Sequence, residues 1–232
     1  MGLLGNTLRA LGRLRHGKGF GIHSPFAYTF IREVLRLPDK YGYYAYHEIS
    51  RMHHDATEAD GIFKVIPLKY LKLIFRIGNF FRSEQVIISG DRNPLVINVV
   101  SLISPDCKVI EVEPSEDNNP ESIRFRSTRK SQATTVRDIS SALPLLNFSG
   151  DSARRPLVII TGDEGGVTTL LNSDSLMAMN PVFIVLNLKH NRRVWNRIAE
   201  AYNEKGMSFA NPHIAVMVTD SGLPRQHFNI WI

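Results

Sequence analysis

The stretch Leu157-Val158-Ile159-Ile160 is a run of apolar residues without the polar alternation of a half-exposed strand. A second run of the same kind spans residues 182–186. Continuous apolar strands are typical of parallel sheets, because helices cover both faces of such sheets and bury every side chain. These two runs therefore predict an α/β fold with a mostly parallel sheet.

Short apolar runs continue to alternate with helical patterns on either side of these two strands. Further strands are expected at residues 86–88, 108–113 and 134–136. Helical patterns follow the first and the third, whereas residues 114–131 after the second are polar and irregular where a helix would normally cover the sheet. Units of this kind with right-handed crossovers build a doubly wound, Rossmann-like sheet. Residues 214–218 and 228–232 have no helix between them, so we expect an antiparallel pair at one edge of a seven-stranded sheet.

Residues 1–82 have a different pattern and predict a helical extension in front of a Rossmann-like domain of residues 83–232. Ser24 is a good N-cap and Pro25 suits the first helical position, so one helix is expected to begin here. Another helix with an apolar side is expected over residues 67–81. Helices with apolar stripes of this width are not stable on their own in water, so both helices should pack on the sheet or on each other.

The net charge of the chain is +6, and much of the excess lies in residues 9–36. A basic arm of this kind can contact nucleic acid or an anionic surface. Aromatic residues that would stack on bases are lacking among the first basic residues apart from Phe20, so nucleic acid is not the expected partner. The leucine stripe of residues 1–14 can instead pair with a second copy, which predicts a homodimer through the N-terminal helix.

No apolar run approaches the roughly twenty residues needed to cross a bilayer, so no membrane span is expected. Arginines interrupt the apolar residues near the N-terminus, which argues against a secretory signal. Cys107 is the single cysteine, so an internal disulfide is excluded and a cytoplasmic location is the expectation. No base lies near Cys107 in the sequence, and a structural role is expected for it.

Three segments of the extension form a recognisable pattern: residues 21–26 read Gly-Ile-His-Ser-Pro-Phe, Tyr43-Tyr44 precede Glu48 and Arg51, and residues 70–76 read Tyr-Leu-Lys-Leu-Ile-Phe-Arg. Together they resemble a group of bacterial methyltransferase-like proteins of the O-methyltransferase type. The strand layout is likewise similar to that of class I S-adenosylmethionine-dependent methyltransferases. The resemblance implies S-adenosylmethionine as cofactor and a small molecule as methyl acceptor.

The resemblance also implies where the cofactor would bind, at the carboxyl ends of the first four strands. The corresponding positions of this chain are Gly90, Asp91, Glu113, Asp138, Thr161 and Gly162. Glu113 at the tip of the second strand fits the family's carboxylate for the ribose. Asp138, after the third strand, fits the acid near the adenine.

The turn after the first strand departs from the family pattern. Residues 89–94 read Ser-Gly-Asp-Arg-Asn-Pro, with a single glycine where the family places several so that the backbone can approach the ligand. Pro94 removes one N–H from the helix end that would face an anion. Where related proteins carry acids after the fourth and fifth strands, this chain has Thr161 and Leu186-Asn187. These changes predict a degenerate site without a metal, and the sequence identifies no catalytic residue.

Two functions are consistent with these residues. The first is S-adenosylmethionine-dependent methyl transfer to a small-molecule acceptor, which would act mainly by orienting an acceptor oxygen against the methyl sulfonium. The second is a catalytically inactive methyltransferase-fold protein that serves for binding or as a scaffold. Titration with S-adenosylmethionine distinguishes the two.

Overall fold

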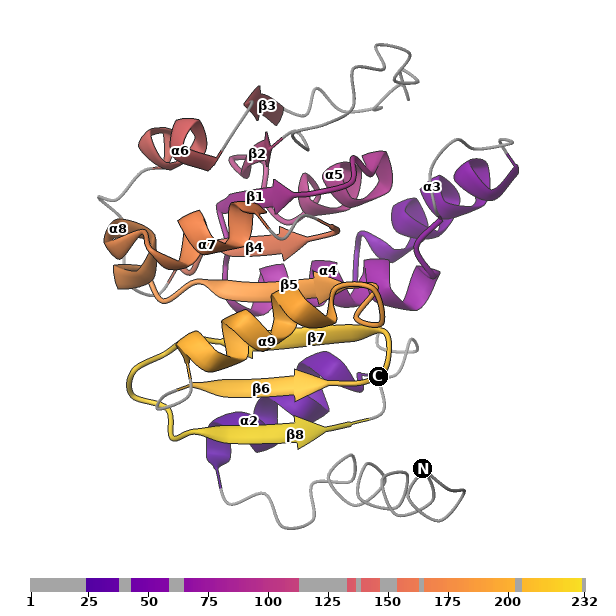
Figure 1. Ribbon diagram of the computed structural model, residues 1–232. Helices are drawn as coiled ribbons and strands as arrows, with labels where there is room; N and C mark the ends of the chain where they lie inside the picture. The colour runs from indigo at the N-terminus through magenta and orange to yellow at the C-terminus, as the bar shows by residue number, and fades with distance from the viewer. Residues whose placement is uncertain are drawn as a thin grey trace.

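A computed structural model describes residues 24–37, 43–58, 65–112, 133–136, 139–146, 154–162, 165–202 and 206–230. The expected helix of residues 1–14 lies outside the described residues, and so do Glu113 and Asp138. Figure 1 shows a twisted sheet with helices on both of its faces. The predicted α/β, doubly wound fold class is therefore confirmed.

The sheet consists of β1 (Gln85–Ser89), β2 (Lys108–Val112), β3 (Ala133–Val136), β4 (Leu157–Ile160), β5 (Val182–Leu186), β6 (Met207–Ala210), β7 (Ile214–Val218) and β8 (Gln226–Asn229). Its order is β3-β2-β1-β4-β5-β7-β6-β8. Strands β1 to β5 pair parallel, β7 is antiparallel to β5 and β6, and β8 is parallel to β6. The order reverses between β1 and β4, and α/β proteins commonly bind ligands at such a switch point.

Two details of the sheet differ from the sequence-based expectation. The sheet has eight strands in place of seven, because the short strand β6 carries no long apolar run that would reveal it. The expected antiparallel pairing of residues 214–218 with residues 228–232 is wrong. Strand β6 lies between β7 and β8, and β8 pairs parallel with β6.

Helices from the N-terminal part of the chain lie on one face of the sheet. They are α2 (Pro25–Phe30), its π-helical continuation η1 (Ile31–Leu35), α4 (Leu68–Phe80) and α5 (Pro94–Val100), and α3 (Tyr46–Glu58) packs on α4 and α5. Their buried side chains form one cluster with strand residues such as Val86, Ile88 and Val216. The expected packing of the N-terminal helices against the sheet is confirmed.

The start of α2 follows the predicted pattern. The Ala27 N–H donates to Ser24 Oγ at 3.3 Å, and Pro25 occupies the first turn. Phe30 is fully buried, and its ring centroid lies 5.0 Å from that of Phe209 on β6. The N-terminal helices and the sheet therefore share one hydrophobic core.

The opposite face of the sheet carries α6 (Ile139–Ala142), the 3-10 turn η2 (Leu143–Leu145), α7 (Gly165–Leu171), α8 (Asp174–Ala178) and α9 (Arg192–Ala201) (Figure 1). Strand residues Ile87, Val158 and Phe183 belong to the core of this face. Successive residues of a strand point to opposite faces, so each central strand contributes to both cores. The carboxyl ends of β1, β4 and β5 meet along one edge, which positions the sites described below.

Two further observations bear on the sequence-based expectations. Within the described ranges, no helix combines the length and apolar character needed to span a bilayer. Cys107 is buried, and this desolvation raises the pKa of its thiol to about 12. The thiol is therefore protonated at neutral pH, which fits a structural role.

Candidate functional site

The turn after β1 carries two residues of the predicted cofactor site, Gly90 and Asp91. Gly90 has a φ angle of +107°, which glycine adopts readily and other residues do not. A Cβ atom at Gly90 would lie 2.3 Å from the backbone nitrogen of Gly162 and 2.5 Å from its carbonyl oxygen. The turn after β1 is therefore in direct backbone contact with the turn after β4.

Thr161 and Gly162, which follow β4, hold the two turns together. The Thr161 N–H donates to the Ser89 carbonyl at 3.0 Å. The Thr161 hydroxyl donates to the Asp91 carbonyl at 2.8 Å, and the Ser89 carbonyl lies 3.2 Å from the same hydroxyl. Gly162 lies against the Asp91 side chain, whose Oδ1 would be 3.1 Å from a Cβ at Gly162. The structure thus brings four predicted residues together, and they contact one another across the switch point.

The N-terminus of α5 follows the turn after β1, and in nucleotide-binding crevices such an end offers free N–H groups to an anion. Asn93 caps this end, since its Oδ1 accepts from the N–H groups of Leu95 and Val96 at 3.2 and 3.4 Å. The Asn93 carbonyl accepts from the Ile97 N–H at 3.3 Å, and Pro94 has no N–H to offer. The donors of the first turn of α5 are therefore bonded within the turn itself.

Arg92 extends the turn after β1 toward β2. Its Nε lies 3.4 Å from Oε2 of Glu111, whose side chain is only 4% exposed. The ion pair covers a carboxylate near the carboxyl end of β2, close to where the resemblance implies the ribose. In the sequence, Arg92 stands out only as one residue of a turn that contains a single glycine.

The described residues at the switch point do not fit S-adenosylmethionine in the way the resemblance implies. That binding mode needs an approachable backbone in the turn after β1 and unbonded N–H groups at the following helix. Here Gly90 faces the backbone of Gly162, and the helix end is capped by Asn93.

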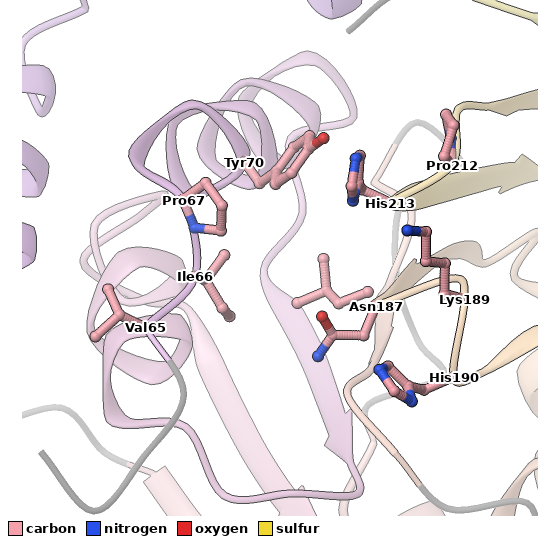
Figure 2. Close-up of a pocket in the computed structure, with 10 residues that line it drawn as sticks. Val65, Ile66, Pro67, Tyr70, Asn187, Lys189, His190, Pro212 and His213 are labelled. Atoms are coloured by element: carbon pink, nitrogen blue, oxygen red, sulfur yellow. The ribbon is translucent and has the colours of Figure 1, made fainter.

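A cavity of about 280 Å³ lies one strand further along the same edge, at the carboxyl end of β5 (Figure 2). One wall is apolar and comes from the segment before α4, with Val65, Ile66 and Pro67, and Leu186 at the end of β5 also lines the cavity. The facing wall comes from the β5–α9 turn and the β6–β7 turn, and it is lined by Asn187, Lys189, His190 and His213. The cavity is therefore amphipathic.

Asn191 at the start of α9 fixes the turn that supplies the polar wall. Its buried side-chain amide donates to the Leu186 carbonyl at 2.7 Å and to the Thr161 carbonyl at 3.2 Å. The Leu188 N–H donates to the His213 carbonyl at 2.9 Å and joins this turn to the β6–β7 turn. The ends of β4 and β5 are thus tied together beside the cavity.

Tyr70 on α4 is the buried polar residue of the cavity. It is 5% exposed, and its hydroxyl has no hydrogen-bond partner in the described part of the chain. Figure 2 shows this hydroxyl directed toward His213, whose ring centroid lies 6.2 Å from that of Tyr70. Buried polar groups are normally bonded, and an unbonded one costs about 1–3 kcal/mol. The wall of the cavity therefore contains a buried donor for which the described residues provide no acceptor.

The sequence did not predict this cavity. Of its lining residues, Leu186 and Asn187 were considered only as positions that lack the family's acids. The consecutive basic residues Lys189 and His190, directly after a buried strand, are the signal that could have pointed here. Within the described residues no group of three or more His, Cys, Asp and Glu side chains could hold a metal ion.

Comparisons with known proteins bear mainly on the fold. No protein-family model matches the chain, and no curated protein matches its sequence. Among solved structures the chain is similar to cofactor-bound Rv0187 from MTB, with 13% identity, coverage of 77% of this chain and 91% of that chain, and a TM-score of 0.49.

Two further solved structures are O-methyltransferases. TomG from Streptomyces achromogenes, involved in tomaymycin synthesis and solved with SAM, is 14% identical over 74% of this chain and 89% of that chain, with a TM-score of 0.46. The Bacillus cereus enzyme, solved with SAH, is 13% identical over 82% and 96%, with a TM-score of 0.45. The sheet layout of the chain agrees with the doubly wound arrangement that the resemblance implied.

Proposed function

We propose that this protein is a methyltransferase-fold binding protein, which takes up a small molecule at the carboxyl end of β5 and transfers no methyl group. The contact between Gly90 and Gly162 carries this proposal, because it joins the turns between which a methyltransferase would bind its cofactor. The cavity beside the switch point supports binding, since it contains a buried hydroxyl that needs an acceptor.

The residues after β4 and β5 support the absence of catalysis. Thr161 and Asn187 stand where the resemblance implies carboxylates. A threonine hydroxyl and an asparagine amide do not take up protons at neutral pH, so neither can act as a general base. The Thr161 hydroxyl is moreover engaged by the Asp91 carbonyl at 2.8 Å. The chain therefore keeps the fold while these positions serve to hold turns in place.

Methyl transfer from S-adenosylmethionine to a small-molecule acceptor is the second candidate. The positive φ angle of Gly90 favours it, because a glycine in this conformation is what a cofactor-binding turn after β1 requires. In that case the cofactor would be lined by Gly90, Asp91, Glu113, Asp138, Thr161 and Gly162. The turn after β1 would then have to separate from Gly162 on binding.

Isothermal titration and thermal-shift measurements with S-adenosylmethionine and S-adenosylhomocysteine on the full chain separate the two candidates. We expect no heat of binding and no rise in melting temperature at millimolar ligand. The Bacillus cereus O-methyltransferase, solved with SAH, is the positive control under the same conditions. A micromolar dissociation constant, or crystallographic density for adenosine beside Gly90, would overturn the proposal in favour of methyl transfer.

A further inference from the structure

We infer that the cavity at the end of β5 binds a small organic carboxylate, with its apolar body against Ile66 and its carboxylate held by Tyr70, Lys189 and His213. This inference rests on the proposed function, because it takes the cavity as the binding site. It goes further by naming the chemical class of the ligand and the residues that select it.

The charge of the polar wall favours an anion. Lys189 is exposed on this wall and forms no ion pair with any residue that the structure describes. The rings of His190 and His213 line the same wall, and none of the described lining residues is acidic. A concave surface with a lysine and no acids concentrates anions. The resemblance implies carboxylates at this edge, so the charge of the site is reversed in this chain.

Tyr70 supplies a directed donor in addition to this charge. Its hydroxyl is buried, lacks a partner among the described residues and points across the cavity toward His213 (Figure 2). A tyrosine hydroxyl is a donor at neutral pH, and a carboxylate oxygen accepts from it in a charge-assisted bond that is stronger than a neutral one. A bound carboxylate would therefore satisfy the buried donor and face Lys189 at the same time.

The apolar wall and the volume define the rest of the ligand. Ile66 is buried, and Val65 and Pro67 lie beside it in the segment before α4, across the cavity from Lys189 (Figure 2). A volume of about 280 Å³ is at the lower end of small-molecule sites, so the body of the ligand is about the size of one or two rings. A bare inorganic anion would leave the apolar wall in contact with water. The two walls together select an amphipathic monocarboxylate.

Ligand-detected NMR with the full chain tests this inference with benzoate and indole-3-acetate as probes, and with benzamide as the neutral match for benzoate. We expect benzoate to bind at least about tenfold more tightly than benzamide, as for a charge-assisted hydrogen bond. Equal affinity for the two, or no binding of any probe at millimolar concentration, overturns the inference. Tighter binding of phenyl phosphate than of benzoate also overturns it and assigns the site to phosphate esters.

Variants connect the binding to the named residues. Tyr70→Phe and Lys189→Gln should each weaken benzoate binding about tenfold. Arg193→Gln is the matched control: it removes one positive charge from α9 at a residue that does not line the cavity, and it should leave binding unchanged. Unchanged affinity in Tyr70→Phe overturns the assignment. The titration with S-adenosylmethionine is independent, so binding of that cofactor would refute the proposed function while the preference for benzoate over benzamide could still be measured.

Discussion

Two neighbouring places on the carboxyl edge of the sheet differ in how their polar groups are bonded. At the switch point, the donors of Thr161, Leu95 and Val96 meet acceptors of the same turns at 2.8 to 3.4 Å. At the end of β5, the Tyr70 hydroxyl is equally buried and has no partner among the described residues. Because burial of an unbonded donor is costly, the ligand proposed above is assigned to the end of β5.

The topology of an α/β sheet specifies where a ligand can bind but not whether it does. Both places lie at the carboxyl ends of parallel strands, and the rule for such sheets applies to both. The side chains of the turns make the difference. Asn93 caps the helix end after β1, whereas the corresponding N-cap of α9, Asn191, makes no such bond and ties the strand ends together instead.

Among the substitutions that test this difference, Gly90→Ala should have the largest effect on the free energy of unfolding. The Cβ would overlap the backbone of Gly162, and alanine would be strained at a φ angle of +107°. We expect a loss of about 3 kcal/mol in the free energy of unfolding, measured in urea. Gly222→Ala is the control, because its Cβ would meet only the end of the Asp220 side chain, at 3.2 Å. Equal, mild effects of the two variants would mean that the turns are not in contact.

Asn191→Ala should cost about 2 kcal/mol, because it leaves the buried carbonyls of Leu186 and Thr161 without their shared donor. Asn191 is the residue that links the closed switch point to the open cavity, so this variant tests whether the two places are coupled. Urea unfolding measures the stability, and the benzoate titration should weaken in parallel. Asn196→Ala on the exposed side of α9 is the control, with an expected change within about 0.5 kcal/mol. Unchanged benzoate affinity in Asn191→Ala would show that the places are independent.

Asn93→Ala should cost about 1 kcal/mol through the lost cap of α5. The informative comparison is Ser173→Ala, which removes the cap of α8, where Ser173 Oγ accepts from the Leu176 N–H at 3.3 Å. Both variants should lose similar stability in thermal unfolding. Only Asn93→Ala exposes N–H groups at the switch point. If S-adenosylmethionine raises the melting temperature of this variant alone, the Asn93 cap is the feature that prevents cofactor binding there.

The fold could be predicted where burial determines the sequence. The continuous apolar runs of β4 and β5 agree with the expected bounds, because both faces of these strands are covered and no polar residue is tolerated. Strand β6 was missed because Met207–Ala210 is short and includes Ser208. Its presence separates β7 from β8 and changes the pairing at that end of the sheet.

The candidate site was less predictable for a physical reason. Gly90 and Thr161 were identified by their places after strands, but the bond between Thr161 and Asp91 joins residues 70 positions apart. Whether two such turns enclose a ligand or touch each other depends on distances of an ångström, which no local pattern encodes. The cavity likewise depends on the meeting of Tyr70 and His213, which are far apart in the sequence.

The smallest expected effect concerns Asn187, which forms part of the polar wall of the cavity. Its backbone lies in the left-handed region, with a φ angle of +50°. Asn187→Gly removes the backbone strain but adds conformational entropy to the unfolded chain, so the two terms nearly cancel and stability should stay within about 0.5 kcal/mol. Asn180 has the same φ angle outside the cavity, and Asn180→Gly should behave alike in urea unfolding. Alanine at either position should cost about 1 kcal/mol, because it keeps the strain.

The two glycine variants should differ in their affinity for benzoate although they have similar stability. Asn187 lines the cavity, whereas Asn180 follows α8 and is not among the residues that line it. Asn187→Gly should therefore weaken benzoate binding, and Asn180→Gly should leave it unchanged. If both glycine variants bind benzoate like the parent chain, the asparagine serves only the geometry of the turn, and the polar wall acts through Tyr70, Lys189 and His213 alone. A marked loss of stability in Asn187→Gly but not in Asn180→Gly would contradict the contrast drawn above, because it would mean that the Asn187 side chain is bonded within the protein as the switch-point residues are.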